Sequence, residues 1–111
     1  MSEAVASIRI DKWLWFARLA KTRSLAARLC EGGRVTIGGA PILKPHHPVR
    51  IGDSVSVAQG QARRRLMVRD LGVRRGPAEE ARRLYDEPAP PVPLAAADPA
   101  WTPLLDEESW A

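Results

Sequence analysis

Two consecutive runs of helical periodicity, closed by a pair of glycines, limit the folds open to the first third of this chain. In the first run, apolar side chains recur at helical spacing: Trp13, Phe16, Ala17 and Ala20, with Leu14 at their margin. The second run carries an apolar stripe of Leu25, Ala26, Leu29 and Cys30. Gly32-Gly33 can adopt the positive φ that ends a helix tightly. The spacing therefore predicts two short amphipathic helices that share one core.

Two polar residues predict where these helices begin. Asp11 precedes the first apolar residue, and its carboxylate can accept hydrogen bonds from backbone N–H groups two or three residues on. Thr22 stands in the break between the two runs and predicts the N-cap of the second helix, which should end near Glu31. The outer side of this second helix carries Arg23, Ser24, Ala27, Arg28 and Glu31. Its cationic side chains are thus separated from its apolar ones.

After the glycine pair, short alternating segments are typical of an antiparallel sheet. Strands are expected at 35–37, 40–43, from Val55 to Val57, and over 63–71. Gly38-Gly39 predicts a hairpin turn between the first two. Pro41, Pro45 and Pro48 predict an irregular edge loop over 44–48. A third helix should start at Pro77. We expect an α+β fold, with two short helices packed on a small, mostly antiparallel sheet and a C-terminal helix after it.

A change of composition predicts a domain boundary after residue 87. Residues 88–103 contain six prolines, which indicates an extended linker. All Lys and Arg residues lie between Arg9 and Arg83, so residues 1–85 carry a charge of +10 and residues 86–111 carry −6. We expect one domain over 1–87 and a proline-rich acidic tail over 88–111. The tail is solubilising, or it folds back on the basic surface, or it docks Trp101, Leu104, Leu105 and Trp110 on the domain.

Several classes of protein are excluded by what the chain lacks. No apolar run approaches the roughly 18 residues that span a bilayer, and the N-terminus does not resemble a secretory signal. The single Cys30 cannot form an internal disulfide. His46-His47 lacks nearby acid or thiol ligands, so an exposed loop is expected there rather than a metal site. We find no glycine-rich phosphate loop and no nucleophile motif, and we expect a cytoplasmic, non-enzymatic protein with no cofactor.

The charge pattern indicates a polyanionic partner. Cationic side chains cluster at two helix ends and the turn between them, where a helix N-terminus beside Thr22 can donate N–H groups to a phosphate. Trp15 lies one helical turn from both Lys12 and Arg18. It could stack on an exposed base, or pack under the tail or the third helix, and packing is the favoured interpretation. Trp13 is assigned to the core.

The stretch RIDKWLWFARLAKTRSLAARLCEGGRVTIGG, followed by KP and IGD, resembles the S4 RNA-binding domain over about residues 9–57. DKWLW, ARLAKTRSLA and RRGPAEEARRLYDE are similar to a family of ribosome-associated bacterial heat-shock proteins of about fifteen kilodaltons, and extend the resemblance to about residue 87. The resemblance implies the S4 (αL) fold and a surface for structured RNA, and also for DNA. Carried over residue by residue, that surface falls on Arg9, Lys12, Arg18, Lys21, Thr22, Arg23, Arg28, Arg34 and Lys44.

The same resemblance implies a role at the large ribosomal subunit, with 23S rRNA and peptidyl-tRNA as partners when a nascent chain is stranded under heat stress. The family carries a long basic C-terminal extension where this chain has an acidic one, so no tail-mediated RNA contact is carried over. We expect a monomer. The alternatives are a general RNA- and DNA-binding S4 protein, an accessory domain of an RNA-modifying enzyme, and a protein-interaction module. Arg9-Ile10-Asp11 superficially resembles a pseudouridine synthase motif, but a helix cap explains Asp11 better.

Overall fold

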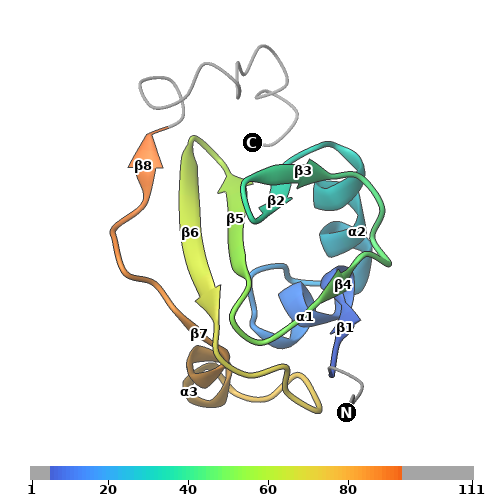
Figure 1. Ribbon diagram of the computed structural model, residues 1–111. Helices are drawn as coiled ribbons and strands as arrows, with labels where there is room; N and C mark the ends of the chain where they lie inside the picture. Colours follow the sequence, from blue (N-terminus) through green and yellow to red (C-terminus); the bar gives the residue numbers. More distant parts are fainter. Residues whose placement is uncertain (1–5, 94–111) are drawn as a thin grey trace.

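The computed structural model describes residues 6–93, in which an antiparallel sheet carries two helices on one face (Figure 1). The elements are β1 (Ile8–Arg9), α1 (Ile10–Phe16), α2 (Arg23–Glu31), β2 (Val35–Ile37), β3 (Ala40–Ile42), β4 (Pro48–Val49), β5 (Ser54–Gln59), β6 (Ala62–Val68), α3 (Ala78–Ala81), the 3-10 turn η1 (Arg82–Leu84), β7 (Tyr85–Asp86) and β8 (Val92–Pro93). The larger sheet has the order β3-β2-β5-β6-β7, with β8 also paired to β6, while β1 and β4 form a separate pair. The α+β fold predicted from the sequence is confirmed.

The core lies between the two helices and the inner face of β2, β5 and β6. Strand register places Val35 opposite Val57, and Val55 opposite Leu66, so these side chains share one face of the sheet. They pack with the fully buried residues of the helices, among them Ile10, Trp13, Leu14, Ala26 and Cys30. Cys30 is buried in the core, as its place in the apolar stripe predicted, and this burial raises the pKa of its thiol to about 12.

Leu25 does not belong to the buried stripe, and its assignment to it was wrong. Its exposed fraction is 39%, whereas those of Ala26, Leu29 and Cys30 are 5% or less. The physical reason is position along the helix rather than position around it. Residues 21–25 are all exposed, so the first turn of α2 extends beyond the core. The N-terminus of α2 is consequently open to solvent.

The first helix ends earlier than its periodicity predicts. Instead of continuing to Ala20, α1 ends at Phe16, and Arg18 adopts a φ of 62°. The N–H groups of Leu19 and Ala20 turn back to the carbonyl of Leu14, at 2.9 and 3.3 Å. This reversal of the chain buries both Leu19 and Ala20. A tight turn therefore places the apolar side chains in the core, just as a longer helix would have done.

Three further boundaries differ from expectation. A short strand that was not expected precedes the first helix, in which Ile8 pairs with Val49 and Arg9 with Pro48, at an edge where proline is tolerated. The strand expected over 63–71 ends at Val68, because the N–H groups of residues 69 and 70 both donate to the Leu84 carbonyl. The third helix is a single turn, Ala78–Ala81, continued by η1.

The start of the proline-rich segment joins the sheet. Val92 pairs with Arg63, and Pro93 with Ala62, at the outer edge of β6. The domain boundary after residue 87 stays a prediction, and the proposed docking of Trp101, Leu104, Leu105 and Trp110 lies outside the described residues. Within residues 6–93, no helix is long and apolar enough to cross a membrane, and no group of three or more His, Cys, Asp or Glu could hold a metal ion.

Candidate nucleic-acid interface

The N-terminus of α2 is capped as the sequence predicts. The hydroxyl of Thr22 accepts a hydrogen bond from the N–H group of Leu25 at 3.0 Å. The N–H group of Ala26 makes the first bond of the helical ladder, to the Thr22 carbonyl at 3.1 Å. The N–H groups of residues 23 and 24 precede that ladder and lie at the solvent-exposed end of the helix. This end of α2 therefore has the geometry that binds anions.

Asp11 is the centre of the cationic cluster at this end of the domain. The Arg9 guanidinium donates to both of its oxygens, at 3.0 and 2.9 Å, and the Arg23 guanidinium lies 3.6 Å from Oδ1. Asp11 is 4% exposed, whereas about half of each arginine side chain is open to solvent. A buried carboxylate thus holds two partly exposed guanidinium groups in one place.

Asp11 does not cap α1, and that prediction was wrong. Arg9 occupies the N-cap position, and no side chain caps the helix. Instead, the N–H groups of Ile10 and Asp11 donate to the carbonyls of His47 and Pro45, at 2.9 and 3.1 Å. Carbonyl groups of the 44–48 loop thus accept hydrogen bonds from the first N–H groups of α1. The Asp11 carboxylate is therefore available to bind Arg9 and Arg23.

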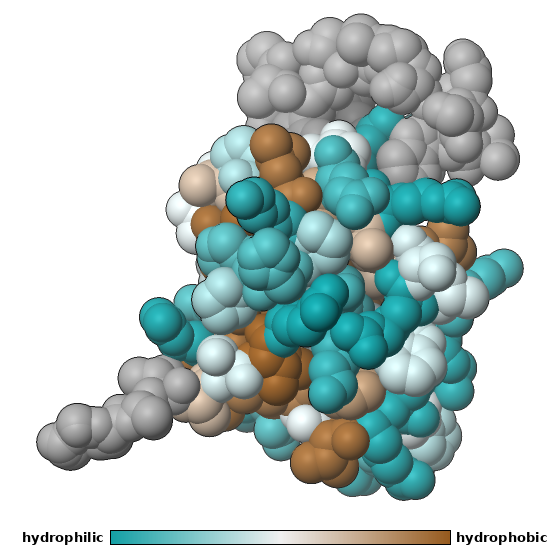
Figure 2. Space-filling view, turned by 90° about the vertical axis from the view of Figure 1, so that its right-hand side faces the viewer, coloured by the Kyte–Doolittle hydropathy of each residue, from teal (hydrophilic) through white to brown (hydrophobic). Residues whose placement is uncertain are grey.

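The same two hydrogen bonds bring Lys44 to the interface. The 44–48 loop lies against the start of α1, and the N–H group of His47 donates to the Lys44 carbonyl within the loop. Lys44 is exposed, as are Lys21 and Arg28 on and beside α2. None of these three makes an ion pair within the described residues. Figure 2 shows that the side of the molecule carrying α2, β3 and β4 in Figure 1 is mostly hydrophilic, with separate apolar patches.

The other predicted residues are placed differently. Arg34 is 8% exposed, so most of its side chain lies away from solvent. The Nε group of Arg18 donates to the Gly76 carbonyl at 2.7 Å, beyond the last residue of α1, whereas the 44–48 loop contacts the first residues of that helix. Lys12 is half-buried, with its ammonium group 5.7 Å from the centre of the Phe16 ring. The structure therefore brings Arg9, Arg23 and the Lys44 loop together, and the place of the buried Arg34 on an RNA surface stays a prediction.

The two tryptophans pack against protein. Trp13 is fully buried, and its indole N–H donates to the Asp70 carbonyl at 2.9 Å. Trp15 is partly buried beside Phe16, and the Arg75 guanidinium lies 5.9 Å from its ring centre. Both contacts come from the segment before α3, which agrees with the favoured interpretation of Trp15 as a packing residue.

Replacing Asp11 with asparagine should lower the stability of the domain. The substitution would remove the negative charge shared by Arg9 and Arg23, and we expect a loss of about 1–2 kcal/mol, reduced from the value for buried pairs because both arginines are half-exposed. Urea unfolding measures this change. The control is Glu31→Gln, an exposed carboxylate, for which we expect a change within about 0.5 kcal/mol. Equal stability of the two variants would show that Asp11 does not organise the cluster.

Comparison with known proteins identifies the class to which this arrangement belongs. The S4 domain family matches residues 8–55, which run from β1 into β5 and include both helices and the 44–48 loop. Every residue of the cluster around Asp11 lies inside that match. The helix pair and the sheet behind it are therefore an S4 domain.

Longer matches extend beyond this domain. Heat shock protein 15 of Escherichia coli (strain K12) is 41% identical over 85 residues, which are 77% of this chain and 63% of that protein. The homolog from Aeromonas salmonicida is 42% identical over 78% of this chain and 64% of its own length. The trimeric structure of Vibrio cholerae heat shock protein 15 superimposes with a TM-score of 0.71 at 40% identity, and covers 76% of this chain and 84% of that one. The chain belongs to the heat shock protein 15 family.

A relative with a different name matches a shorter part of the chain. The RQC P-site tRNA stabilizing factor of Halalkalibacterium halodurans is 41% identical over 54 residues, which are 49% of this chain and 60% of that protein. The match to this chain also spans less than two thirds of the curated heat shock protein 15 relatives. Similarity to these proteins therefore covers part of each of them.

Proposed function

We propose that this protein is a non-enzymatic RNA-binding factor that docks on structured RNA of the large ribosomal subunit, 23S rRNA, in the rescue or quality control of stalled nascent-chain complexes under heat stress. The observation that carries the RNA-binding part is the cluster around Asp11 beside the open N-terminus of α2. The ribosomal part rests on membership of the heat shock protein 15 family.

The cluster keeps both positive charge and free donors. One carboxylate is shared by two guanidinium groups, so a net charge of about +1 remains before Lys21, Arg28 and Lys44 are added. Arg9 donates to Asp11 through Nε and Nη2, which leaves its Nη1 group for another acceptor. Guanidinium groups held in this way lose little freedom when they bind a phosphate.

The names of the relatives support the choice of partner. One relative is named for stabilising a P-site tRNA, and its similarity to this chain covers 60% of its own length. We therefore propose peptidyl-tRNA as a second partner, next to rRNA on the same subunit.

Cytoplasmic location and a monomeric state stay predictions. Because the Vibrio cholerae relative is described as trimeric, light scattering at several concentrations is the direct measurement of the monomer prediction.

Binding to 23S rRNA should weaken steeply with salt. With Arg34 buried and Arg18 bonded to Gly76, six predicted cations remain to contact phosphates: Arg9, Lys12, Lys21, Arg23, Arg28 and Lys44. Six neutralised phosphates give a slope of about −4 to −5 for the logarithm of the association constant against that of salt concentration. Fluorescence anisotropy with labelled rRNA fragments, at salt concentrations from about 50 to about 300 mM, measures it. A flat response would overturn the proposal.

Three competing functions make different predictions. A general S4 protein without a ribosomal role would bind duplex DNA and unrelated RNA as tightly as 23S rRNA at equal salt. If the protein were an accessory domain of an RNA-modifying enzyme, the RNA that it binds would contain modified uridine. We expect no modified uridine in that RNA. Sedimentation with purified large and small ribosomal subunits, before and after nuclease treatment, separates the ribosomal proposal from these two. Nuclease-resistant association would instead favour a protein-interaction module.

A further inference from the structure

The segment that follows β6 lies outside the S4 match and is bound to α1 and the turn after it by three side-chain hydrogen bonds. The Trp13 indole donates to the Asp70 carbonyl at 2.9 Å, and the Arg75 Nε group donates to the Trp15 carbonyl at 3.1 Å. In the opposite direction, the Arg18 Nε group donates to the Gly76 carbonyl at 2.7 Å. Residues 70–76 are thereby held along α1, next to the candidate interface.

Packing then holds η1 against this segment. Gly72 has a φ of 78°, and a Cβ atom there would lie 3.2 Å from the Leu84 side chain and 3.4 Å from that of Phe16. The Leu84 carbonyl accepts from the N–H groups of residues 69 and 70, at 2.8 and 3.2 Å. Because Leu84 is buried at the end of η1, the two arginines before it project from a well-anchored turn.

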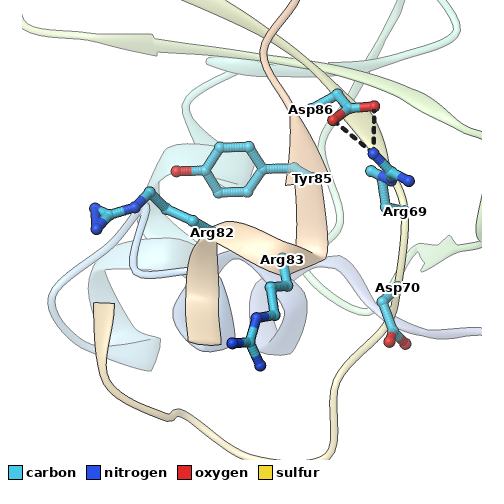
Figure 3. Close-up of a pocket in the computed structure, with 6 residues that line it drawn as sticks. All are labelled: Arg69, Asp70, Arg82, Arg83, Tyr85 and Asp86. Atoms are coloured by element: carbon cyan, nitrogen blue, oxygen red, sulfur yellow. Dashed lines mark hydrogen bonds and ion pairs between the residues drawn. The ribbon is translucent and has the colours of Figure 1, made fainter. Parts of the chain in front are cut away.

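Those two arginines line an open pocket of about 510 Å³ (Figure 3). Its other lining residues are Arg69, Asp70, Tyr85 and Asp86. The Arg69 guanidinium donates hydrogen bonds to both carboxylate oxygens of Asp86, at 2.9 and 3.1 Å. The Tyr85 ring is fixed by an edge contact with Trp13, with the ring centres 6.4 Å apart. The pocket is therefore a basic surface with a rigid aromatic wall.

Arg82 and Arg83 keep their charge available. Both side chains are exposed, and within residues 6–93 neither forms an ion pair. Glu80, on the turn before these arginines, is hydrogen-bonded to Arg74, which lowers the pKa of Glu80, and the charge of Arg83 adds to that effect. Figure 3 shows the Asp70 carboxylate pointing away from Arg82, so it does not neutralise that guanidinium.

We propose that Arg82 and Arg83 bind a second stretch of phosphodiester backbone on the same RNA that docks at α2. This inference rests on the proposed RNA-binding function. Two exposed guanidinium groups on one turn match the oxygens of phosphate groups, which arginine binds in a bidentate manner. Contacts of α1 link the two sites: its Asp11 lies 3.6 Å from the Arg23 guanidinium, and its tryptophans are hydrogen-bonded to residues of the 70–76 segment. An RNA on this surface would thus cross α1.

The test compares Arg82→Ala/Arg83→Ala with Arg65→Ala, which removes an exposed arginine from β6 with no ion pair in the described residues. Two phosphate contacts at Arg82 and Arg83 would steepen the slope expected from the six cations near α2 by about 2. Their loss should return the slope to about −4 to −5 and weaken binding to the 23S rRNA fragment by about tenfold or more. Arg65→Ala should leave both unchanged. Arg82→Lys/Arg83→Lys should recover most of the slope because it keeps the charge. Circular dichroism confirms that each variant is folded.

Hydroxyl-radical footprinting shows whether the two sites are separate. Arg82→Ala/Arg83→Ala should lose protection of one RNA segment and keep the segment protected through Arg23 and Arg28. Unchanged affinity and slope for this variant would overturn the second site, and so would an equal loss in Arg65→Ala. Either result leaves the proposed function intact as long as the Arg23 and Arg28 variants lose binding. Failure of the wild-type protein to bind RNA would instead overturn the proposed function.

Discussion

Reversing the charge of both Arg23 and Arg28 to glutamate should reduce the affinity for 23S rRNA by at least about a hundredfold, which amounts to loss of measurable binding at physiological salt. Arg23 contributes the guanidinium shared with Asp11, and Arg28 is an exposed cation on the same helix. Each reversal removes a phosphate contact and adds repulsion, at the open end of α2 for position 23 and in the last turn of the same helix for position 28. Anisotropy with labelled rRNA measures the affinity of the variant.

The fold should survive this double reversal. A glutamate at position 23 would lie near Asp11, but it would also sit in the first turn of α2, where the helix dipole favours negative charge by about 0.3–1 kcal/mol. At position 28, a glutamate in the last turn should cost a similar amount. The matched control is Arg23→Lys/Arg28→Lys, which keeps the charge and should bind within about tenfold of wild type. Wild-type affinity in the folded glutamate variant would contradict the assignment of the surface.

Replacing Trp13 with alanine should cost about 3–5 kcal/mol of unfolding free energy. Trp13 is fully buried, contacts Tyr85 edge-on, and donates its indole N–H to the Asp70 carbonyl. The substitution creates a cavity between α1 and β7 and removes one of the bonds that hold residues 70–76. Since small domains have total stabilities of about 5–15 kcal/mol, a large fraction of the variant should be unfolded at elevated temperature.

Denaturant unfolding, followed by circular dichroism because the substitution removes a tryptophan fluorophore, measures this loss. Trp13→Phe keeps most of the ring and should lose less. Val73→Ala is the surface control, since Val73 is 89% exposed and should change the unfolding free energy by less than about 0.5 kcal/mol. A loss below about 1 kcal/mol for Trp13→Ala would show that the segment after β6 is held by other contacts.

Local features of the domain were predictable because their signals lie close together in the sequence. Thr22 is the N-cap of α2, and Gly33 adopts a φ of 74° at the end of that helix, as expected. Gly38 and Gly39 both have positive φ in the hairpin between β2 and β3. These choices depend on a few neighbouring residues, so a short window of sequence contains the information.

The errors arose where a tertiary contact replaced a local one. Asp11 has the sequence context of a helix cap, but the carbonyls of the 44–48 loop satisfy the start of α1 and leave its carboxylate to Arg9 and Arg23. The burial of Arg34, which is 8% exposed beside the end of α2, was not evident from the sequence either, and its role in RNA binding stays a prediction. A single charged residue has no periodicity from which its burial could be calculated.

The sequence by itself determined which residues could make a basic helical pair and a sheet behind it, through apolar spacing, caps and glycine turns. Only the tertiary structure decided which cations meet. Asp11 and Arg23 are joined across the α1–α2 turn, and the contacts of Trp13, Arg18 and Arg75 reach between segments 57 to 60 residues apart. Such long-range hydrogen bonds follow from how the helices pack on the sheet. The sequence around one partner contains no signal that identifies the other, so they could not be predicted from a short stretch of residues.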